Sequence, residues 1–197
     1  MKPKEKLFLT LFLFITSIAF AQDNTKEIDS QFTDYLNSII NQDFEKSMDY
    51  MAEDLFKILP KEQMVLMMEK TFNNPAMEFE LKEPKILKID DSQQIEGKHY
   101  AVLTYSNLIN MKFLIDEEET EDEHKLRINL TKLALINTFG SGNVKHNEKT
   151  DFFKIYSEKH ACAISANGKT GWKFLVLDKE QKFILEQLLP KQIIDTM

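Results

Sequence analysis

The fold of this chain is decided by three consecutive runs: Asp151-Phe152-Phe153-Lys154-Ile155-Tyr156, His160-Ala161-Cys162-Ala163-Ile164-Ser165 and Gly171-Trp172-Lys173-Phe174-Leu175-Val176-Leu177. Short runs rich in aromatic and β-branched residues indicate strands. Their connections, residues 157–159 and 166–170, have the length and polarity of hairpin loops. The stretch therefore predicts three antiparallel strands in the middle of a sheet.

The last of these runs carries apolar side chains on both of its faces. Trp172, Phe174 and Val176 point to one side, and Leu175 and Leu177 point to the other, because successive residues of a strand alternate. A sheet with two apolar faces needs cover on both. We expect helices to provide it.

Residues 26–73 supply the first helices. Apolar residues recur every three or four positions over residues 26–40, as in a helix with one buried stripe. Asp43 is placed to cap a second helix, with its apolar stripe running on to Leu55, and Pro60 occupies the favoured start of a third. The run Asn73-Asn74-Pro75 ends that helix.

Residues 77–115 then predict strands. Polarity alternates from Met77 to Ile89, residues 90–97 read as a turn, and one long strand runs from His99 to about Ile115.

The segment of residues 126–139 fits two patterns. Leu126, Ile128 and Leu130 alternate as in a strand, whereas Leu126, Leu130 and Leu133 share one side of a helix. An acidic lead-in and the following Gly140 favour a helix. A last helix is expected after Asp178, with an interruption at the proline of position 190.

These elements predict an α+β fold in which N-terminal helices pack on a curved antiparallel sheet, with an inserted helix and a C-terminal helix. Residues 1–21 have the basic start, the short apolar run and the Ala19-Phe20-Ala21 site of a secretory signal peptide. We therefore expect an exported protein, periplasmic or extracellular, whose mature part is a single domain over residues 22–197. An uncleaved membrane anchor is the alternative.

Composition excludes several classes of function. Cleavage would remove three lysines and one glutamate and change the net charge from −7 to −9. With Arg127 as the only arginine and no basic cluster, a nucleic-acid partner is not expected. Cys162 is the only cysteine, which excludes an intrachain disulfide.

No cofactor, metal or catalytic residue is predicted. The acidic run of residues 116–123 lacks the interleaved spacing of a calcium loop and reads as a solvated loop. His160 and Cys162 share one face of a strand but have no third group to complete a catalytic or metal site. The methionines of residues 48–68 could bind copper, yet their apolar stripes favour core packing.

The long strand offers one indication of a pocket. Tyr105 and Asn107 are polar residues in an apolar strand and could line a cavity if the sheet curls around the helices. Together with Trp172 they are the candidate ligand-contacting residues. The alternative is that they face outward on a partly exposed strand.

The order of three helices, two strands, one helix and closing strands resembles the nuclear transport factor 2-like superfamily, in particular its small exported bacterial proteins. The segments that carry the resemblance are Asn41-Gln42-Asp43-Phe44-Glu45-Lys46 and Gly171-Trp172-Lys173-Phe174-Leu175. The resemblance implies a conical pocket, and some members are cyclase-like or isomerase-like enzymes with an Asp base. No residue here matches that base, and a shared fold does not carry activity with it.

Three functional hypotheses follow. The first is a non-enzymatic domain that binds a small molecule or a protein in the concave face of the sheet. The second is a small isomerase-like or cyclase-like enzyme with an acid or base in the same cavity. The third is a structural protein anchored by its leader.

The signal-peptide interpretation makes a measurable prediction. Intact-mass spectrometry of the exported protein should give a chain that begins at Gln22, because the small residues before it fit the cleavage pocket of signal peptidase. A mass that includes residues 1–21 would favour the anchored alternative.

Overall fold

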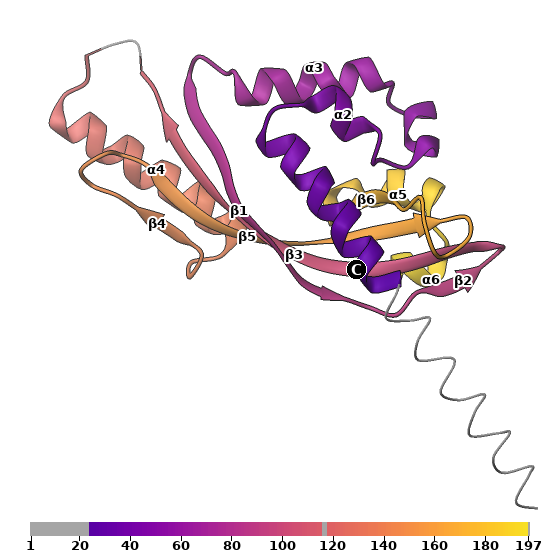
Figure 1. The fold of residues 1–197 in the computed structure, drawn as a ribbon. Coiled ribbons are helices and arrows are strands. Elements are labelled where there is room, and N and C mark those ends of the chain that lie inside the picture. Colours follow the sequence, from indigo (N-terminus) through magenta and orange to yellow (C-terminus); the bar gives the residue numbers. More distant parts are fainter. Residues whose placement is uncertain (1–23, 116–117, 197) are drawn as a thin grey trace, which may run out of the picture.

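The computed structural model describes residues 24–115 and 118–196 and has an α+β fold, as the sequence predicts (Figure 1). The predicted signal peptide and Asp116 and Glu117 of the acidic run lie outside the described residues. Within the described residues, no helix has both the length and the apolar character needed to cross a bilayer.

The elements follow the predicted order with several differences in length. Residues 24–40 form the N-terminal helix. It is followed by α2 (Phe44–Met48), the 3-10 helix η1 (Glu53–Lys57), α3 (Lys61–Phe72), β1 (Met77–Ile89), β2 (Gln93–Ile95), β3 (Lys98–Phe113), α4 (Glu121–Phe139), β4 (Val144–His146), β5 (Phe153–Ser165), β6 (Lys173–Leu177), η2 (Lys179–Gln181), α5 (Lys182–Leu188) and α6 (Lys191–Ile194).

The sheet is antiparallel and is built around its two longest strands. Its main path runs β1-β3-β5-β4, with β2 also paired to β3 and β6 also paired to β5. β3 and β5 pair without interruption from His99↔Ser165 to Met111↔Phe153. The other four strands pair with one or other of these two.

The prediction of a hairpin at residues 157–159 is wrong, because these residues continue β5. Ser157, Glu158 and Lys159 pair with residues of β3 in unbroken register. The segment has no Gly or Asn to adopt the positive φ that tight hairpins require, and no Pro to set the first position of a turn. The long partner strand offers a complete ladder instead, and buried Ser157 lies on the face that continues into the core.

The hairpin between β5 and β6 is confirmed. The side-chain oxygen Oδ1 of Asn167 accepts hydrogen bonds from the backbone N–H groups of Lys169 and Thr170, at 2.8 and 2.9 Å. Gly168 has a φ of +68°, and a Cβ there would lie 2.5 Å from the imidazole of His99. Only glycine meets both the backbone and the steric requirement at this turn.

One further element, the helix after Asp43, is shorter than predicted. The helix that begins after Asp43 stops at Met48, because the backbone of residues 50–52 bonds to Phe174 at the outer edge of β6. β1 has its predicted extent, Met77–Ile89, and continues through Pro84, where the register to β3 shifts between Lys82 and Lys85. A proline is tolerated there because β1 is an edge strand with a bulge.

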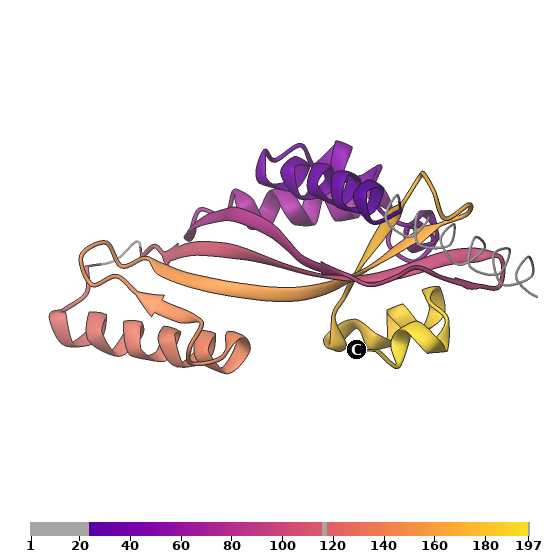
Figure 2. The same cartoon turned by 60° about the horizontal axis from the view of Figure 1, so that its bottom comes forward.

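The helices lie on both sides of the sheet (Figure 2). The N-terminal helix, α2 and α3 cover one side near the middle of the molecule, and α4 and the α5–α6 pair lie on the other side at opposite ends. Three separate clusters of buried residues correspond to these helices: a large one under the N-terminal helices, one under α5 and α6, and a small one under α4.

The large cluster is centred on an aromatic side chain of the N-terminal helix. Phe32 is fully buried, and its ring lies edge-on to Tyr105 and to Phe174, with centroids 5.0 and 4.9 Å away. Such contacts add to the free energy gained from burial. Phe32 therefore joins the helical layer to two strands of the sheet.

Replacement of Phe32 should destabilise the protein strongly. Phe32→Ala is expected to lower the free energy of unfolding by about 3–5 kcal/mol, since it removes a buried ring and leaves a cavity. Urea denaturation followed by circular dichroism measures this. The matched control is Phe183→Ala on α5, where the ring is 77% exposed and the change should be within about 0.5 kcal/mol. Equal losses of unfolding free energy in Phe32→Ala and Phe183→Ala would contradict the placement of Phe32 in the core.

Candidate functional site

The residues predicted to line a pocket lie on the side of the sheet covered by the N-terminal helices. Tyr105 and Trp172 are buried in the same large cluster, and burial raises the pKa of Tyr105 above its usual range. Asn107 is also buried, and its Oδ1 has no hydrogen-bond partner. None of the three lines the pockets described below. Their role in ligand binding stays a prediction.

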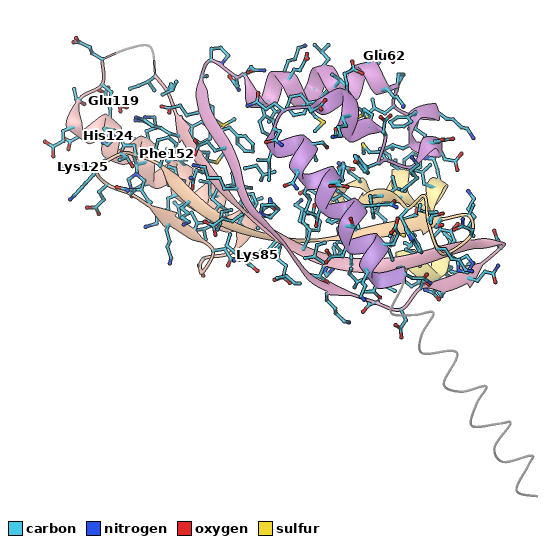
Figure 3. All side chains as sticks on the ribbon, in the orientation of Figure 1. Glu62, Lys85, Glu119, His124, Lys125 and Phe152 are labelled. Carbon is cyan, nitrogen blue, oxygen red and sulfur yellow. The ribbon has the colours of Figure 1, made fainter. Side chains whose placement is uncertain are left out.

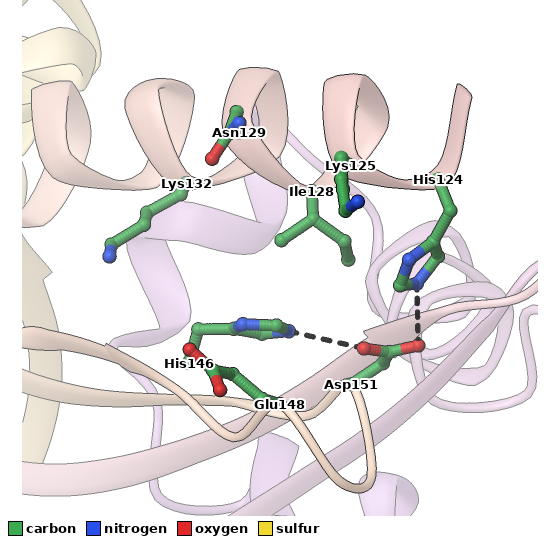
Figure 4. Close-up of a pocket in the computed structure, with 8 residues that line it drawn as sticks. All are labelled: His124, Lys125, Ile128, Asn129, Lys132, His146, Glu148 and Asp151. Carbon is green, nitrogen blue, oxygen red and sulfur yellow. Dashed lines mark hydrogen bonds and ion pairs between the residues drawn. The ribbon is translucent and has the colours of Figure 1, made fainter. Parts of the chain in front are cut away.

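A pocket of about 420 Å³ lies at the other end of the molecule, between α4 and the β4–β5 loop (Figure 4). We call it the histidine–aspartate pocket. Its lining comprises His124, Lys125, Ile128, Asn129 and Lys132 of α4, His146 of β4, and Glu148 and Asp151 of the loop. Figure 3, which draws all the described side chains, shows His124 and Lys125 at the α4 end of the molecule, far from Glu62 on α3.

Local interactions determine where α4 begins. The hydroxyl of Thr120 accepts a hydrogen bond from the backbone N–H of Glu123, and the carboxylate of Glu123 accepts one from the backbone N–H of Thr120. This capping box satisfies two amide groups at the start of the helix. Arg127 donates two hydrogen bonds to Glu119, which holds the segment before α4 against its second turn and keeps the pKa of Glu119 below its usual value. The first turns of α4 are therefore fixed in place.

The β4–β5 loop is ordered around Asn147. Its backbone carbonyl accepts from the N–H groups of Thr150 and Asp151, and its side chain accepts from the N–H of Lys149 at 3.0 Å. Asp151 follows with a φ of +59°, a left-handed conformation that Asp and Asn tolerate better than other non-glycine residues. The turn that contains this residue brings the carboxylate of Asp151 beneath α4.

Two imidazoles converge on that carboxylate. Nε2 of His124 lies 2.8 Å from Oδ2 of Asp151, and Nε2 of His146 lies 3.3 Å from Oδ1 (Figure 4). The second contact is close enough for an ion pair but is not aligned as a hydrogen bond, so both buried atoms lack a hydrogen-bond partner. The imidazole ring of His146 packs against the ring of Phe153, with the two centroids 4.8 Å apart. This contact restricts the orientation of the imidazole.

The pKa of Asp151 reflects this arrangement. Burial by itself would raise the pKa, but the hydrogen bond from His124 and the charges of His124 and His146 outweigh it and hold the pKa below its usual value. Asp151 is thus a carboxylate whose negative charge is already engaged by two imidazoles.

The other charged side chains of the pocket differ in whether they have an ion-pair partner. Lys125 pairs with Glu121 at 2.5 Å, in an exposed ion pair on α4. Lys132 has no carboxylate partner within the part of the chain that the structure describes, and Glu148 is exposed at the rim. Ile128 contributes an apolar wall. The pocket can thus offer an ammonium, an amide and two imidazole edges to a polar ligand.

Among the described residues, no group of three or more His, Cys, Asp or Glu side chains is arranged to hold a metal ion. Cys162 is fully buried, and burial raises the pKa of its thiol to about 12, which disfavours the thiolate that a nucleophilic cysteine needs. His160 is exposed, and its Nδ1 lies 3.0 Å from the hydroxyl of Thr104.

Two other hollows are present. One, of about 680 Å³, lies between the end of α4 and η2, over residues 156–160 of β5. It is lined by side chains of both charges. These include an ion pair in which Nζ of Lys159 lies 3.0 Å from Oδ2 of Asp178. The other, of about 350 Å³, lies between η1 and β6. Neither brings two imidazoles onto one carboxylate, so the histidine–aspartate pocket is the better candidate.

The sequence does not reveal this pocket, because its lining residues follow no regular spacing along the chain. His124 and His146 lie on a helix and on a strand, and only the packing of α4 over the loop brings both to Asp151. A weak signal was available in the loop, where Asn147 and Asp151 are residues that favour turns.

Comparison with protein-family models, with curated proteins and with solved structures gives no significant match for this chain. The resemblance to the nuclear transport factor 2-like superfamily therefore stays a prediction.

The pairing of Asp151 predicts a pH-dependent stability. A carboxyl group whose pKa is lowered by folding stabilises the folded state above its unfolded-state value, and this contribution is lost as the pH falls through the folded-state value. Asp151→Asn should therefore be less stable than the parent protein at pH 7, with the difference shrinking below about pH 4.

Urea unfolding of both proteins between neutral pH and about pH 3 measures this difference. The matched control is Asp91→Asn, in an exposed loop, which should show no such trend. A constant difference between Asp151→Asn and the parent across the range would contradict the ion-pair assignment.

Proposed function

We propose that the protein binds a small polar ligand with one anionic group in the histidine–aspartate pocket and does not transform it. The observation that supports this most is the pair of imidazoles held on one carboxylate, beside the unpaired ammonium of Lys132. Pockets of a few hundred Å³ with a few convergent polar groups are typical of small-molecule sites.

The charges favour an anion of low charge. Since Asp151 is engaged by His124 and His146, its carboxylate repels an incoming anion less than a free one would. Lys132 is available to pair with a carboxylate or phosphate group. Glu148 at the rim disfavours a polyanion, because like charges close together repel.

The unsatisfied atoms also favour a ligand. Nε2 of His146 and Oδ1 of Asp151 are buried and have no hydrogen-bond partner among the residues that the structure describes. Buried polar groups of this kind are costly unless something satisfies them. A hydroxyl or amide of a ligand that reached these atoms could donate to the carboxylate and so offset that cost.

This proposal keeps the binding hypothesis and changes its location. The concave side of the sheet, where Tyr105 and Trp172 lie, is packed with aromatic side chains of the N-terminal helix. The pocket under α4 has room for a molecule. Export through the predicted signal peptide would make the ligand one that is met outside the cytoplasm.

A second candidate is an acid–base enzyme at the same pocket. Nε2 of His124 is held by Asp151 at 2.8 Å, which leaves the other ring nitrogen free to exchange a proton with a substrate. A carboxylate that orients an imidazole is the arrangement used by general bases. Mass spectrometry of the native protein from its own host distinguishes the two, since a binding protein retains an unaltered molecule and an enzyme turns it over.

The binding proposal is tested by titration with defined probes. Acetate, phosphate and glutamate should perturb the NMR signals of His124 and His146, and at least one should bind with a measurable dissociation constant. Lys132→Ala should weaken that binding roughly tenfold, the loss of about one charge-assisted hydrogen bond.

The matched control is Lys70→Ala on α3, which removes an equally exposed lysine far from the pocket and should leave the affinity unchanged. Binding that is insensitive to Lys132→Ala, or no perturbation by any of the probes, would refute the proposed site.

A further inference from the structure

α4 presents three different side chains to the histidine–aspartate pocket, one on each of three successive turns. His124, Ile128 and Lys132 are spaced four residues apart, so they lie on one side of the helix. Eight residues of helix rise by about 12 Å, which separates the backbone of His124 from that of Lys132 along the pocket. The helix therefore gives the pocket a hydrogen-bonding end, an apolar middle and a cationic end.

The hydrogen-bonding end contains two polar atoms that are not satisfied. Figure 4 shows Asp151 beneath His124, Lys132 towards the opposite end, and His146 between them. Nε2 of His124 engages Oδ2 of Asp151 at 2.8 Å. The other oxygen, Oδ1, lies 3.3 Å from Nε2 of His146, and both atoms are buried without a hydrogen-bond partner among the described residues.

A single hydroxyl group can satisfy both atoms. Oδ1 of the ionised carboxylate can only accept a hydrogen bond. Nε2 of His146 faces that oxygen, and this favours a proton on Nε2 over a lone pair turned towards the negative charge. A hydroxyl donates and accepts through one oxygen, whereas an ammonium only donates and an ether oxygen only accepts. Because the two atoms are 3.3 Å apart, that oxygen can lie within hydrogen-bond distance of both.

The cationic end is provided by Lys132. Lys125, the other lysine of the lining, pairs with Glu121 and lies beside the end that His124 occupies. Lys132 has no carboxylate partner among the described residues, and it comes one turn beyond Ile128. A carboxylate of the ligand is therefore expected at Lys132, at the far end of the pocket from Asp151.

We infer that the ligand of this pocket is a linear hydroxy acid whose hydroxyl lies several carbons from its carboxylate, an inference that rests on the proposed function. The hydroxyl bonds to Asp151 and His146. The methylene chain lies along Ile128, and the carboxylate pairs with Lys132. A 2-hydroxy acid does not span this distance, because its two polar groups are on adjacent carbons. Glu148 at the rim favours one carboxylate over a doubly charged phosphate.

Isothermal titration of the full chain with two pairs of acids tests the inference. The ligand 6-hydroxyhexanoate should bind about tenfold more tightly than hexanoate, since its hydroxyl forms hydrogen bonds that include a charged group. Glycolate should gain nothing over acetate, because its hydroxyl does not reach Asp151 and His146 while Lys132 holds its carboxylate. An equal gain in the two pairs would overturn the required separation.

Three variants locate the two ends of the ligand. His146→Phe keeps a ring against Phe153 but removes Nε2, so the affinity ratio between 6-hydroxyhexanoate and hexanoate should fall severalfold. Lys132→Ala should weaken the binding of both acids by the same factor and leave the ratio unchanged. The matched control is His160→Phe, at an exposed histidine of β5 outside the pocket, which should change neither affinity.

The outcomes separate this inference from the proposed function. Lys132-dependent binding of hexanoate with no gain from the hydroxyl would overturn the hydroxy-acid inference and leave the anion site standing. Binding of none of the four acids would overturn both. A ratio that survives His146→Phe would place the hydroxyl elsewhere and would also overturn the inference. The comparison of hexanoate with 6-hydroxyhexanoate in the parent protein decides the question even if His146→Phe does not fold.

Discussion

The uninterrupted pairing of β3 with β5 is the constraint on which the rest of the structure depends. It runs from His99↔Ser165 to Met111↔Phe153 and gives the sheet a length greater than one helical layer can cover. The N-terminal helices cover the middle, and each end then needs its own cover. For this reason the buried residues divide into three clusters rather than one, and α4 closes the end furthest from the α5–α6 pair.

The fold could be predicted from the sequence wherever a local signal agreed with the tertiary arrangement. The apolar period of residues 26–40, the start of α3 after Pro60 and the turn at Gly168 are signals of this kind. The prediction of a hairpin at residues 157–159 is wrong, because polarity in a short segment does not by itself make a turn. The partner strand decides such cases, since a polar segment beside a long strand can pair like an apolar one.

The candidate site could not be predicted, because none of its contacts is local. His146 and Asp151 come close in the chain, yet the sequence does not show that a helix carrying His124 will lie above them. The helical stripe of Leu126, Leu130 and Leu133 was also misleading in one respect. It indicated a helix correctly, but a stripe of this kind normally faces the core, and here it faces away from it.

The pocket and the exposed leucines of α4 lie on opposite sides of that helix. The cluster under α4 has four buried members, Ile128, Val144, Phe153 and Ile155, so few apolar contacts hold the helix to the sheet. A ligand in the pocket would touch α4 and the β4–β5 loop together and so stabilise their contact, by an amount that grows with its concentration over its dissociation constant. Ligand binding is therefore expected to stabilise most the end of the molecule whose cluster has the fewest buried members among the described residues, because the ligand adds contacts between α4 and the loop there.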